Sequence, residues 1–262
     1  METIVFAGLV GMVVGSFLNV VIARVPVHFA SPRPTVWGLL VSLSTPGSSC
    51  CHCRRRLVWW ENIPLVSYVM LGGKCRTCRG GIAVRYLIVE VFVALEYIAL
   101  ALLGRWGIGS AIWVAAITAL AFLDLESRTL PDLVTLPLLG LGLARSLGGG
   151  QVHFPEAAVA ALAAYLYFYL VAMLSKMLAG RAALGGGDAK LVAALGAWLG
   201  LVPIALVVAA ASIASLLILV VAPRYLVAGR LRPFPFGAVL CVASALCYLL
   251  LPYRFHLPYV DF

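Results

Sequence analysis

Two aspartates interrupt segments that are otherwise apolar. Asp124 ends the stretch AITALAFLD, and Asp188 follows three glycines in LGGGDAKL. A carboxylate inside a membrane segment is costly and usually functional. Two carboxylates at one depth can share a proton, so that one acts as general base toward a water while the other donates to a scissile carbonyl. The structural alternative is that Asp188 only caps a helix and that Asp124 is only an interfacial residue.

The glycines before Asp188 favour the chemical interpretation. The run Gly185 to Gly187 has no side chains, so the backbone of a substrate can approach the carboxylate closely. If Asp188 lies at the start of a helix, the helix dipole also stabilises its anion. We therefore expect Asp188 to be presented to a ligand.

Four cysteines form two close pairs, Cys50-x-x-Cys53 and Cys75-x-x-Cys78, with 21 residues between the pairs. Each pair presents two sulfurs to one point, which suits tetrahedral Zn²⁺. A site of four thiolates has no open position for a substrate, so we expect a structural role. Two disulfides or four unrelated thiols are the alternatives, and a reducing cytoplasm argues against disulfides.

Other potential ligands lie inside or outside these pairs. Cys51 and His52 fall within the first pair and compete with it as ligands. Cys241 and Cys247 fall in the last apolar segment, where we expect them to be packing residues.

The composition is that of a polytopic membrane protein. Of the 262 residues, 63% are hydrophobic and 11% are charged, and the mean hydropathy is +1.06. A soluble domain has roughly 25% charged residues. Long apolar segments in a bilayer must be helices, because lipid cannot satisfy open backbone groups. The net charge of +9 follows from membrane topology, and a nucleic-acid partner is not expected.

The apolar pattern predicts an all-α polytopic membrane protein with about eight transmembrane helices. The sixth segment is too short to cross a bilayer alone. We therefore expect it to be tilted, to merge with the seventh segment or to be re-entrant. The predicted segments are residues 3–23, 84–103, 107–123, 130–146, 156–178, 188–199, 201–221 and 236–251.

The basic residues predict the orientation of these helices. Nine of the 19 lysines and arginines lie between residues 24 and 85, and such residues concentrate on the cytoplasmic side. The expected organisation is a first transmembrane helix over residues 1–23, a small cytoplasmic four-cysteine zinc domain over 24–83 and a transmembrane core over 84–262. Eight spans then place both termini outside, and Asp124 and Asp188 at the cytoplasmic edge of the membrane.

Several motifs in this order resemble the type IV prepilin peptidases, bacterial membrane aspartic peptidases of the GxGD class. The first span carries GSFLNVVIARVP, and the two CxxC pairs are followed by RYLIVE at the entry to the second span. The segments DLESRTLPDLVTLPLL from Asp124 and GGGDAKLVAALGAWLG from Gly185 resemble those with the two catalytic aspartates. PFPFGAVL from Pro233 resembles the start of the last span.

The resemblance implies that Asp124 and Asp188 are the catalytic pair. Family members remove the short basic leader of type IV prepilins and pseudopilins at the cytoplasmic edge of the bacterial inner membrane, leaving an apolar N-terminal helix in the bilayer. Many also methylate the new N-terminus with S-adenosylmethionine, but the chain has no glycine-rich nucleotide loop for that donor. Asp132 matches the family's Leu-Pro-Asp position, and we interpret it as a cap of the fourth helix.

Two other classes of protein remain alternatives. A cation-coupled transporter would use Glu90, Glu96 and Asp188 as a proton path, although the chain shows no internal repeat. A non-catalytic assembly scaffold would use the zinc loop to dock its partners. Cleavage of a prepilin by the purified protein separates the peptidase from both.

Overall fold

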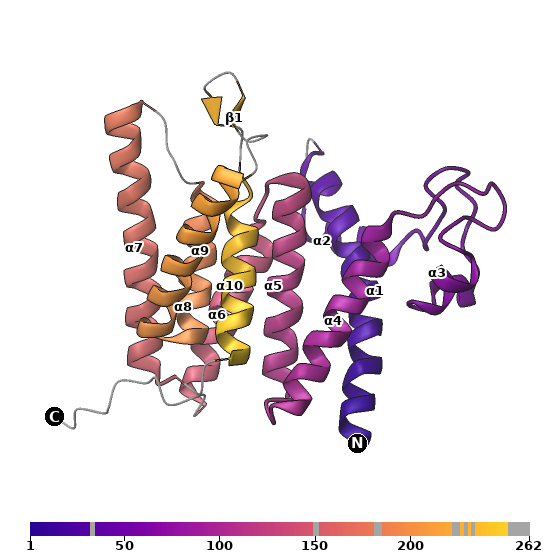
Figure 1. Ribbon diagram of the computed structural model, residues 1–262, viewed down its shortest axis with the longest axis horizontal. Coiled ribbons are helices and arrows are strands. Elements are labelled where there is room, and N and C mark those ends of the chain that lie inside the picture. The colour runs from indigo at the N-terminus through magenta and orange to yellow at the C-terminus, as the bar shows by residue number, and fades with distance from the viewer. Residues whose placement is uncertain are drawn as a thin grey trace. The chain divides into compact units, whose positions relative to one another are not determined.

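The computed structural model describes residues 1–31, 35–148, 152–180, 185–221, 226–227, 230–231 and 234–250. These residues are helical or irregular, apart from one short hairpin of β1 (Leu226–Val227) and β2 (Arg230–Leu231). The chain forms two compact units, Met1–Ala115 and Ala116–Phe262, with the boundary inside helix α5 (Ile108–Ser127). Figure 1 shows the helices of both units. The expected all-α class is therefore confirmed.

The first unit is built on two helices in close contact, α1 (Glu2–Phe29) and α4 (Val84–Leu102). A Cβ added at Gly11 would lie 2.7 Å from the Cα of Ala94, and one added at Gly15 would lie 2.8 Å from the Cα of Glu90. Small residues allow apolar helices to approach this closely in a membrane. These glycines therefore determine the packing of the two helices.

Helix α1 extends six residues beyond the predicted end of the first span at residue 23, as far as Phe29. A second helix, α2 (Val36–Ser44), follows, and the apolar pattern did not predict it. The Thr35 hydroxyl accepts a hydrogen bond from the backbone N–H of Gly38 at 3.0 Å, so it caps α2. Arg24 donates hydrogen bonds to the carbonyls of Ser42 and Pro46, which holds the end of α2 against α1.

The four-cysteine segment contains little regular structure. A 3-10 helix, η1 (Trp59–Asn62), and a short helix, α3 (Val66–Met70), are joined by irregular backbone. Two isolated bridges, Ser49 with Arg56 and Lys74 with Gly81, enclose the two CxxC pairs. The backbone thus folds each pair into a separate tight loop.

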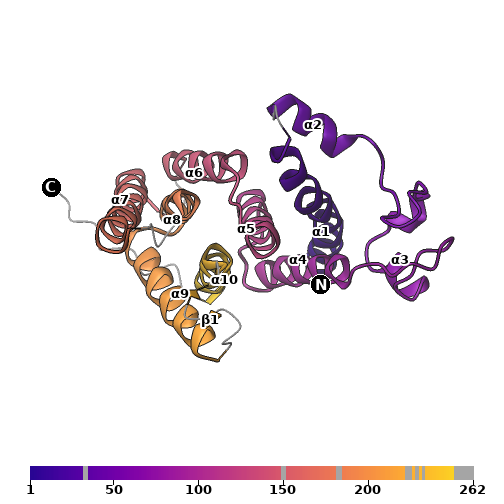
Figure 2. The ribbon, with the colours of Figure 1, turned by 90° about the horizontal axis from the view of Figure 1, so that it is seen from above.

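The second unit surrounds helix α8 with other helices. Helix α8 (Gly186–Leu199) packs against α6 (Asp132–Leu147), α7 (Phe154–Ala179), α9 (Leu201–Val221) and α10 (Phe236–Leu250). Figure 2 shows α8 between α7 and α10. Every α8 residue from Leu191 to Leu199 is buried, as expected of a helix that is apolar all round. A Cβ added at Gly196 would lie 2.9 Å from the Ala160 carbonyl oxygen, so α7 and α8 are in close contact.

Helices occupy all eight segments that the apolar pattern predicts, but their lengths differ. Four of the described helices, α1, α5, α7 and α9, are long and apolar enough to cross a membrane, and α10 is a shorter apolar helix. Helix α8 has 14 residues, which agrees with the expectation that this segment cannot cross alone. A membrane protein is thus supported, and the number of eight spans stays a prediction.

Candidate functional site

Asp124 lies near the end of α5 and is buried, with 6% of its surface exposed. Its Oδ2 atom accepts a hydrogen bond of 2.8 Å from the backbone N–H of Ala238, in the first turn of α10. The first N–H groups of a helix have no partner within the helix and readily bind an anion. Helix α10 therefore holds one oxygen of this carboxylate, and Oδ1 is left for other contacts.

Asp188 occupies the third position of α8 and is half-buried. Its Oδ2 atom accepts a hydrogen bond of 3.1 Å from the backbone N–H of Gly185, which closes the first turn of the helix. Asp124 lies near enough to act electrostatically on the Asp188 carboxylate. The fold of the second unit thus brings together the two carboxylates that the sequence singled out, and each is held through Oδ2.

Leu130 lies against one glycine of α8 and one of α10, close to both aspartates, and the sequence did not identify it. A Cβ added at Gly187 would lie 3.0 Å from the Cβ of Leu130, and one added at Gly237 would lie 2.9 Å from its Cδ1. The same Cβ at Gly237 would lie 3.1 Å from the Oδ2 of Asp124. Both glycines are needed because Leu130 and Asp124 occupy the space that a side chain would fill.

The interpretation of Asp132 as a helix cap is wrong. The N-cap residue of α6 is Pro131, and Asp132 is the first residue of the helix itself. It instead accepts two hydrogen bonds from the Nζ of Lys190, at 2.7 and 2.8 Å. Lys190 lies two positions after Asp188, so this ion pair joins the starts of α6 and α8 beside the aspartate pair.

We expect Gly237→Ala to lower peptide-bond cleavage while leaving the fold intact. The new methyl group forces Leu130 or Asp124 to move by a few tenths of an ångström, and a small misplacement of a reacting group costs roughly tenfold in rate. Gly140→Ala in α6 is the matched control, because its added Cβ has no neighbour within 4 Å. Cleavage rates of a synthetic substrate measure the effect, and equal rates for both variants would contradict the tight packing at Gly237.

The four paired cysteines form one cluster in the first unit. Their Sγ atoms all lie within 4.8 Å of one another, and Cys50 and Cys78 are 3.8 Å apart. A tetrahedral Zn²⁺ with Zn–S bonds of about 2.3 Å requires sulfurs about 3.8 Å apart. The cluster can therefore bind a metal ion, and its dimensions fit zinc.

The backbones of the two CxxC loops repeat the same hydrogen bonds. The N–H groups of Cys50 and Cys75 donate to the carbonyls of Arg55 and Gly80, each five residues further along the chain. The carbonyls of the same two cysteines accept from Arg54 and Arg79, and both arginines have a φ of 57°. The repeated fold aims both pairs at one point. Cys51 is exposed and outside the cluster.

The backbone of the second loop prepares Cys75 for metal binding. Hydrogen bonds from the backbone N–H groups of Cys78 and Thr77 lower the pKa of the Cys75 thiol to about 6. The lowered pKa favours the thiolate form of Cys75, and a thiolate is the form that binds zinc. His52, the other competing ligand, has its Nε2 atom 3.2 Å from the Gly81 carbonyl oxygen and lies outside the cluster.

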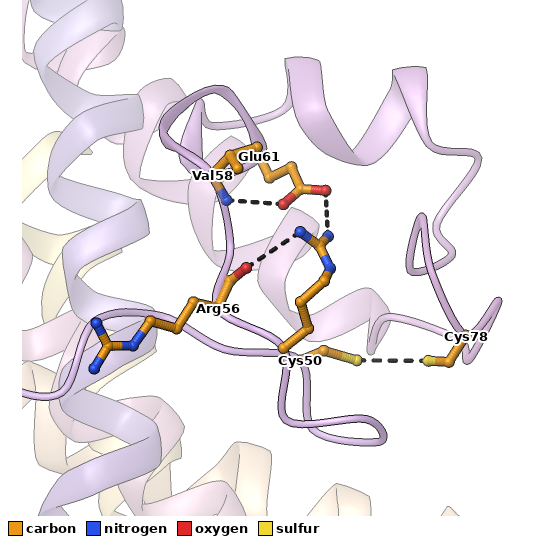
Figure 3. Close-up of polar contacts among 6 residues, drawn as sticks. Cys50, Arg56, Val58, Glu61 and Cys78 are labelled. Carbon is orange, nitrogen blue, oxygen red and sulfur yellow. Dashed lines mark hydrogen bonds and ion pairs between the residues drawn. The ribbon is translucent and has the colours of Figure 1, made fainter.

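Glu61 has a structural role that the sequence did not reveal. Only 6% of the residue is exposed, and its carboxylate forms an ion pair of 2.6 Å with Arg55 (Figure 3). The Arg55 bond and a hydrogen bond from the Val58 N–H lower the pKa of Glu61. Arg55 also interacts with the Cys75 thiol, so Glu61 orients a cation beside the cluster.

Glu61→Gln should weaken zinc binding roughly tenfold, since outer partners of metal ligands commonly change affinity by that order. The neutral amide no longer pairs with Arg55, which then loses its fixed position near Cys75. Competition with a chelator measures the affinity. Glu2→Gln, an exposed change at the start of α1, serves as the control and should retain the wild-type affinity.

One acid of the alternative proton path, Glu90, has a structural environment. Glu90 in α4 accepts a hydrogen bond of 2.8 Å from the backbone N–H of Leu65, just before α3. It also interacts with the Ser16 hydroxyl on α1. This carboxylate thus ties the cysteine-bearing segment to the helices, which is a structural role.

Long apolar helices and two carboxylates within electrostatic reach of each other favour the class of helical membrane hydrolases. Residues 9–103 match the family model of the bacterial peptidase A24 N-terminal domain, and residues 111–220 match that of the type IV leader peptidase family. The chain belongs to the type IV leader peptidase family, and the resemblance seen in its motifs is confirmed.

Whole proteins show the same relationship. Relatives named prepilin leader peptidase/N-methyltransferase come from Neisseria gonorrhoeae, with 36% identity over 91% of this chain and 87% of that protein, and from Burkholderia pseudomallei strain 1026b, with 39% identity over 92% and 83%. One from Dickeya chrysanthemi is 37% identical over 91% of this chain and 89% of its own length. No solved structure matches the chain. These matches favour a peptidase and give no support to a transporter.

Proposed function

We propose that this leader peptidase uses Asp124 and Asp188 to hydrolyse the bond after the basic leader of type IV prepilins and related pseudopilins. The observation that carries the proposal is the approach of the two carboxylates from α5 and α8, each with Oδ2 fixed by a backbone N–H. Fixed carboxylates that share one proton can act as an acid and a base at the same time.

The expected reaction needs no covalent intermediate. The ionised carboxylate takes a proton from a water, whose oxygen attacks the scissile carbonyl carbon, while the protonated carboxyl donates its proton to the carbonyl oxygen. The carboxyl that took the water proton then donates it to the nitrogen as the C–N bond breaks, and the other carboxylate takes a hydroxyl proton back from the intermediate, which releases the leader acid and the new amine. The Oδ1 atoms of Asp124 and Asp188 carry these protons, because each Oδ2 is engaged by backbone.

The names of the relatives include a second activity, N-methyl transfer, and we extend it to this chain. S-adenosylmethionine is the expected methyl donor. The groove between α9 and α10 does not fit it, because that groove is lined by apolar side chains and one cysteine and offers no charged group for the donor. We therefore assign no residue to the methyl donor and derive no step for it.

We propose that the four-cysteine cluster holds a structural zinc ion. Cys50, Cys53, Cys75 and Cys78 supply a closed set of four thiolates, which leaves no open coordination position. The metal would stabilise a segment whose regular structure amounts to η1 and α3. We propose that the chain has three functional parts: a first transmembrane helix over residues 1–23, a cytoplasmic zinc domain over 24–83 and a transmembrane core over 84–262.

We propose that the protein lies in the bacterial inner membrane, with both termini outside and the site at the cytoplasmic face. The support is the excess of lysine and arginine between residues 24 and 85. Reporter tags inserted within residues 54–79 should report cytoplasm, and a tag after residue 262 should report outside. Tags near Arg181, Arg224 and Arg232 should also report cytoplasm, although these positions lie outside the described residues. A cytoplasmic C-terminus would mean an odd number of spans.

The function is tested with purified protein in detergent and a synthetic prepilin. A leader peptidase shortens the substrate at one bond, and mass spectrometry gives the masses of the two products. A transporter or a scaffold leaves the substrate intact, so an uncut prepilin would contradict the proposed function.

A further inference from the structure

An apolar groove runs between α9 and α10, with a volume of about 420 Å³. Helix α10 contributes one face of lining residues, at positions separated by three or four: Val239, Val242, Ala243, Leu246, Cys247 and Leu250. Helix α9 contributes Leu206, Val207, Ala210 and Ala214. Several lining side chains are half-exposed, among them Leu206 at 49% and Val242 at 48%, so the groove opens outward.

The lining has the properties of a helix-docking surface. Three of its residues are alanines, Ala210, Ala214 and Ala243, and small residues let the backbone of another apolar helix approach closely. The lining from Val239 to Leu250 covers about 17 Å along α10, which is about half the thickness of the hydrocarbon core of a membrane. An apolar helix of about 11 residues matches this length.

The groove lies next to the proposed catalytic site in the sequence of α10. Val239, its first lining residue on α10, directly follows Ala238, whose backbone N–H holds the Asp124 carboxylate. A chain bound at the two aspartates and continuing along α10 enters the groove at once. This continuity favours the substrate over an unrelated occupant.

We propose that the α9–α10 groove, defined by these ten lining residues, binds the apolar helix that follows the cleaved bond of the substrate. The inference rests on the proposed function, since it assigns part of the substrate to a surface next to the aspartate pair. The leader would lie on the other side of the pair, and the groove would select substrates with an apolar helix directly after the cleavage point.

The proposed binding mode predicts which residue of the substrate helix lies beside each residue of α10. Cys247 lies nine residues beyond Ala238 on α10, which is about 13 Å along the helix axis. A substrate helix that runs parallel to α10 from the cleaved bond places roughly its ninth residue beside Cys247. Cys247 therefore offers a natural thiol with which to measure the position of the substrate.

The first test is a scan of single cysteines through the first 20 or so residues after the cleavage point of a synthetic prepilin. After oxidation with copper phenanthroline, disulfides to Cys247 should be strongest near position nine and weaker one turn before and after it. Cys247→Ser must remove the signal. A disulfide signal without this maximum would overturn the proposal. The absence of any disulfide would overturn it too, since a groove filled by lipid gives no cross-link. Disulfides between two Cys247 residues would assign the groove to a second copy of the chain and overturn it too.

The second test fills the groove. Ala210→Leu and Ala243→Leu should raise the KM for full prepilin at least tenfold, while a short peptide that ends five residues after the cleaved bond should be cut at the wild-type rate. Ala209→Leu is the matched control, since Ala209 is exposed on the same helix and does not line the groove. Equal kinetics for all three variants would overturn the proposal that the groove binds the substrate. That result would not contradict the proposed peptidase activity. Failure of the wild type to cut either substrate would contradict the proposed function instead.

Discussion

Asp124→Asn and Asp188→Asn are each expected to abolish leader cleavage, with a loss of at least about a thousandfold. Asparagine keeps the size of the side chain and can still accept the backbone hydrogen bond from Ala238 or Gly185. It cannot take a proton from water or share one with its partner. The change therefore removes proton transfer and preserves the local geometry, which separates chemistry from structure.

The double variant should be no worse than either single variant, because the two carboxylates act as a unit. The pH profile of the wild type should be bell-shaped, with two apparent pKa values that belong to the pair. Cleavage rates, zinc content and solubility in detergent are the measurements. Additive losses, or zinc loss in these variants, would indicate separate structural roles for the two aspartates.

Each single replacement of a paired cysteine by serine, at Cys50, Cys53, Cys75 or Cys78, should remove most of the bound zinc. The zinc content should fall from about one ion per chain to less than about a tenth of an ion per chain. The free energy of binding at a structural zinc site is also folding free energy, so residues 49–81 should become sensitive to protease. Apolar packing contributes little to this segment, because its two buried residues are Cys75 and the acid Glu61. Metal analysis and limited proteolysis measure both effects.

Cys51→Ser is the matched control for the metal site. Cys51 lies next to Cys50 but is exposed and outside the cluster. Cys241→Ser and Cys247→Ser in α10 should also retain zinc. Zinc loss in Cys51→Ser equal to that in Cys50→Ser would show that the first loop binds metal through a different thiol. A wild-type protein without bound zinc or a similar thiophilic metal would contradict the proposed metal site.

The apolar periodicity predicted the helices well because a bilayer leaves backbone few other conformations. Each of the eight predicted segments is helical over most of its described residues, and the segment 201–221 coincides with α9. Helix α2 was missed because its single capping signal, Thr35, follows a stretch rich in proline. The six extra residues of α1 were missed because Pro26 within them reads as a helix breaker.

The aspartates and cysteines were identifiable because their residue types carry chemistry at any position. Leu130, Gly237 and Ala238 carry no such signal, and only the fold shows that they surround Asp124. The role of Asp132 was misassigned, and that of Glu61 was missed, for a related reason. An acid at a helix start or in a loop has an obvious local role, whereas its partner, Lys190 or Arg55, is a matter of tertiary structure.

We expect Asp124, and not Asp132, to pair with Asp188 in catalysis. Both lie in the segment DLESRTLPD, but Asp132 is half-exposed and paired with Lys190, and an exposed ion pair contributes only about 0–1 kcal/mol. The most direct measurement is product mass after incubation of a synthetic prepilin with purified Asp124→Asn or Asp132→Asn protein. We expect Asp132→Asn, like Glu126→Gln, to release leader and mature chain at close to the wild-type rate, and Asp124→Asn to release neither. Cleavage by Asp124→Asn together with an inactive Asp132→Asn would contradict the account and assign catalysis to Asp132 and Asp188.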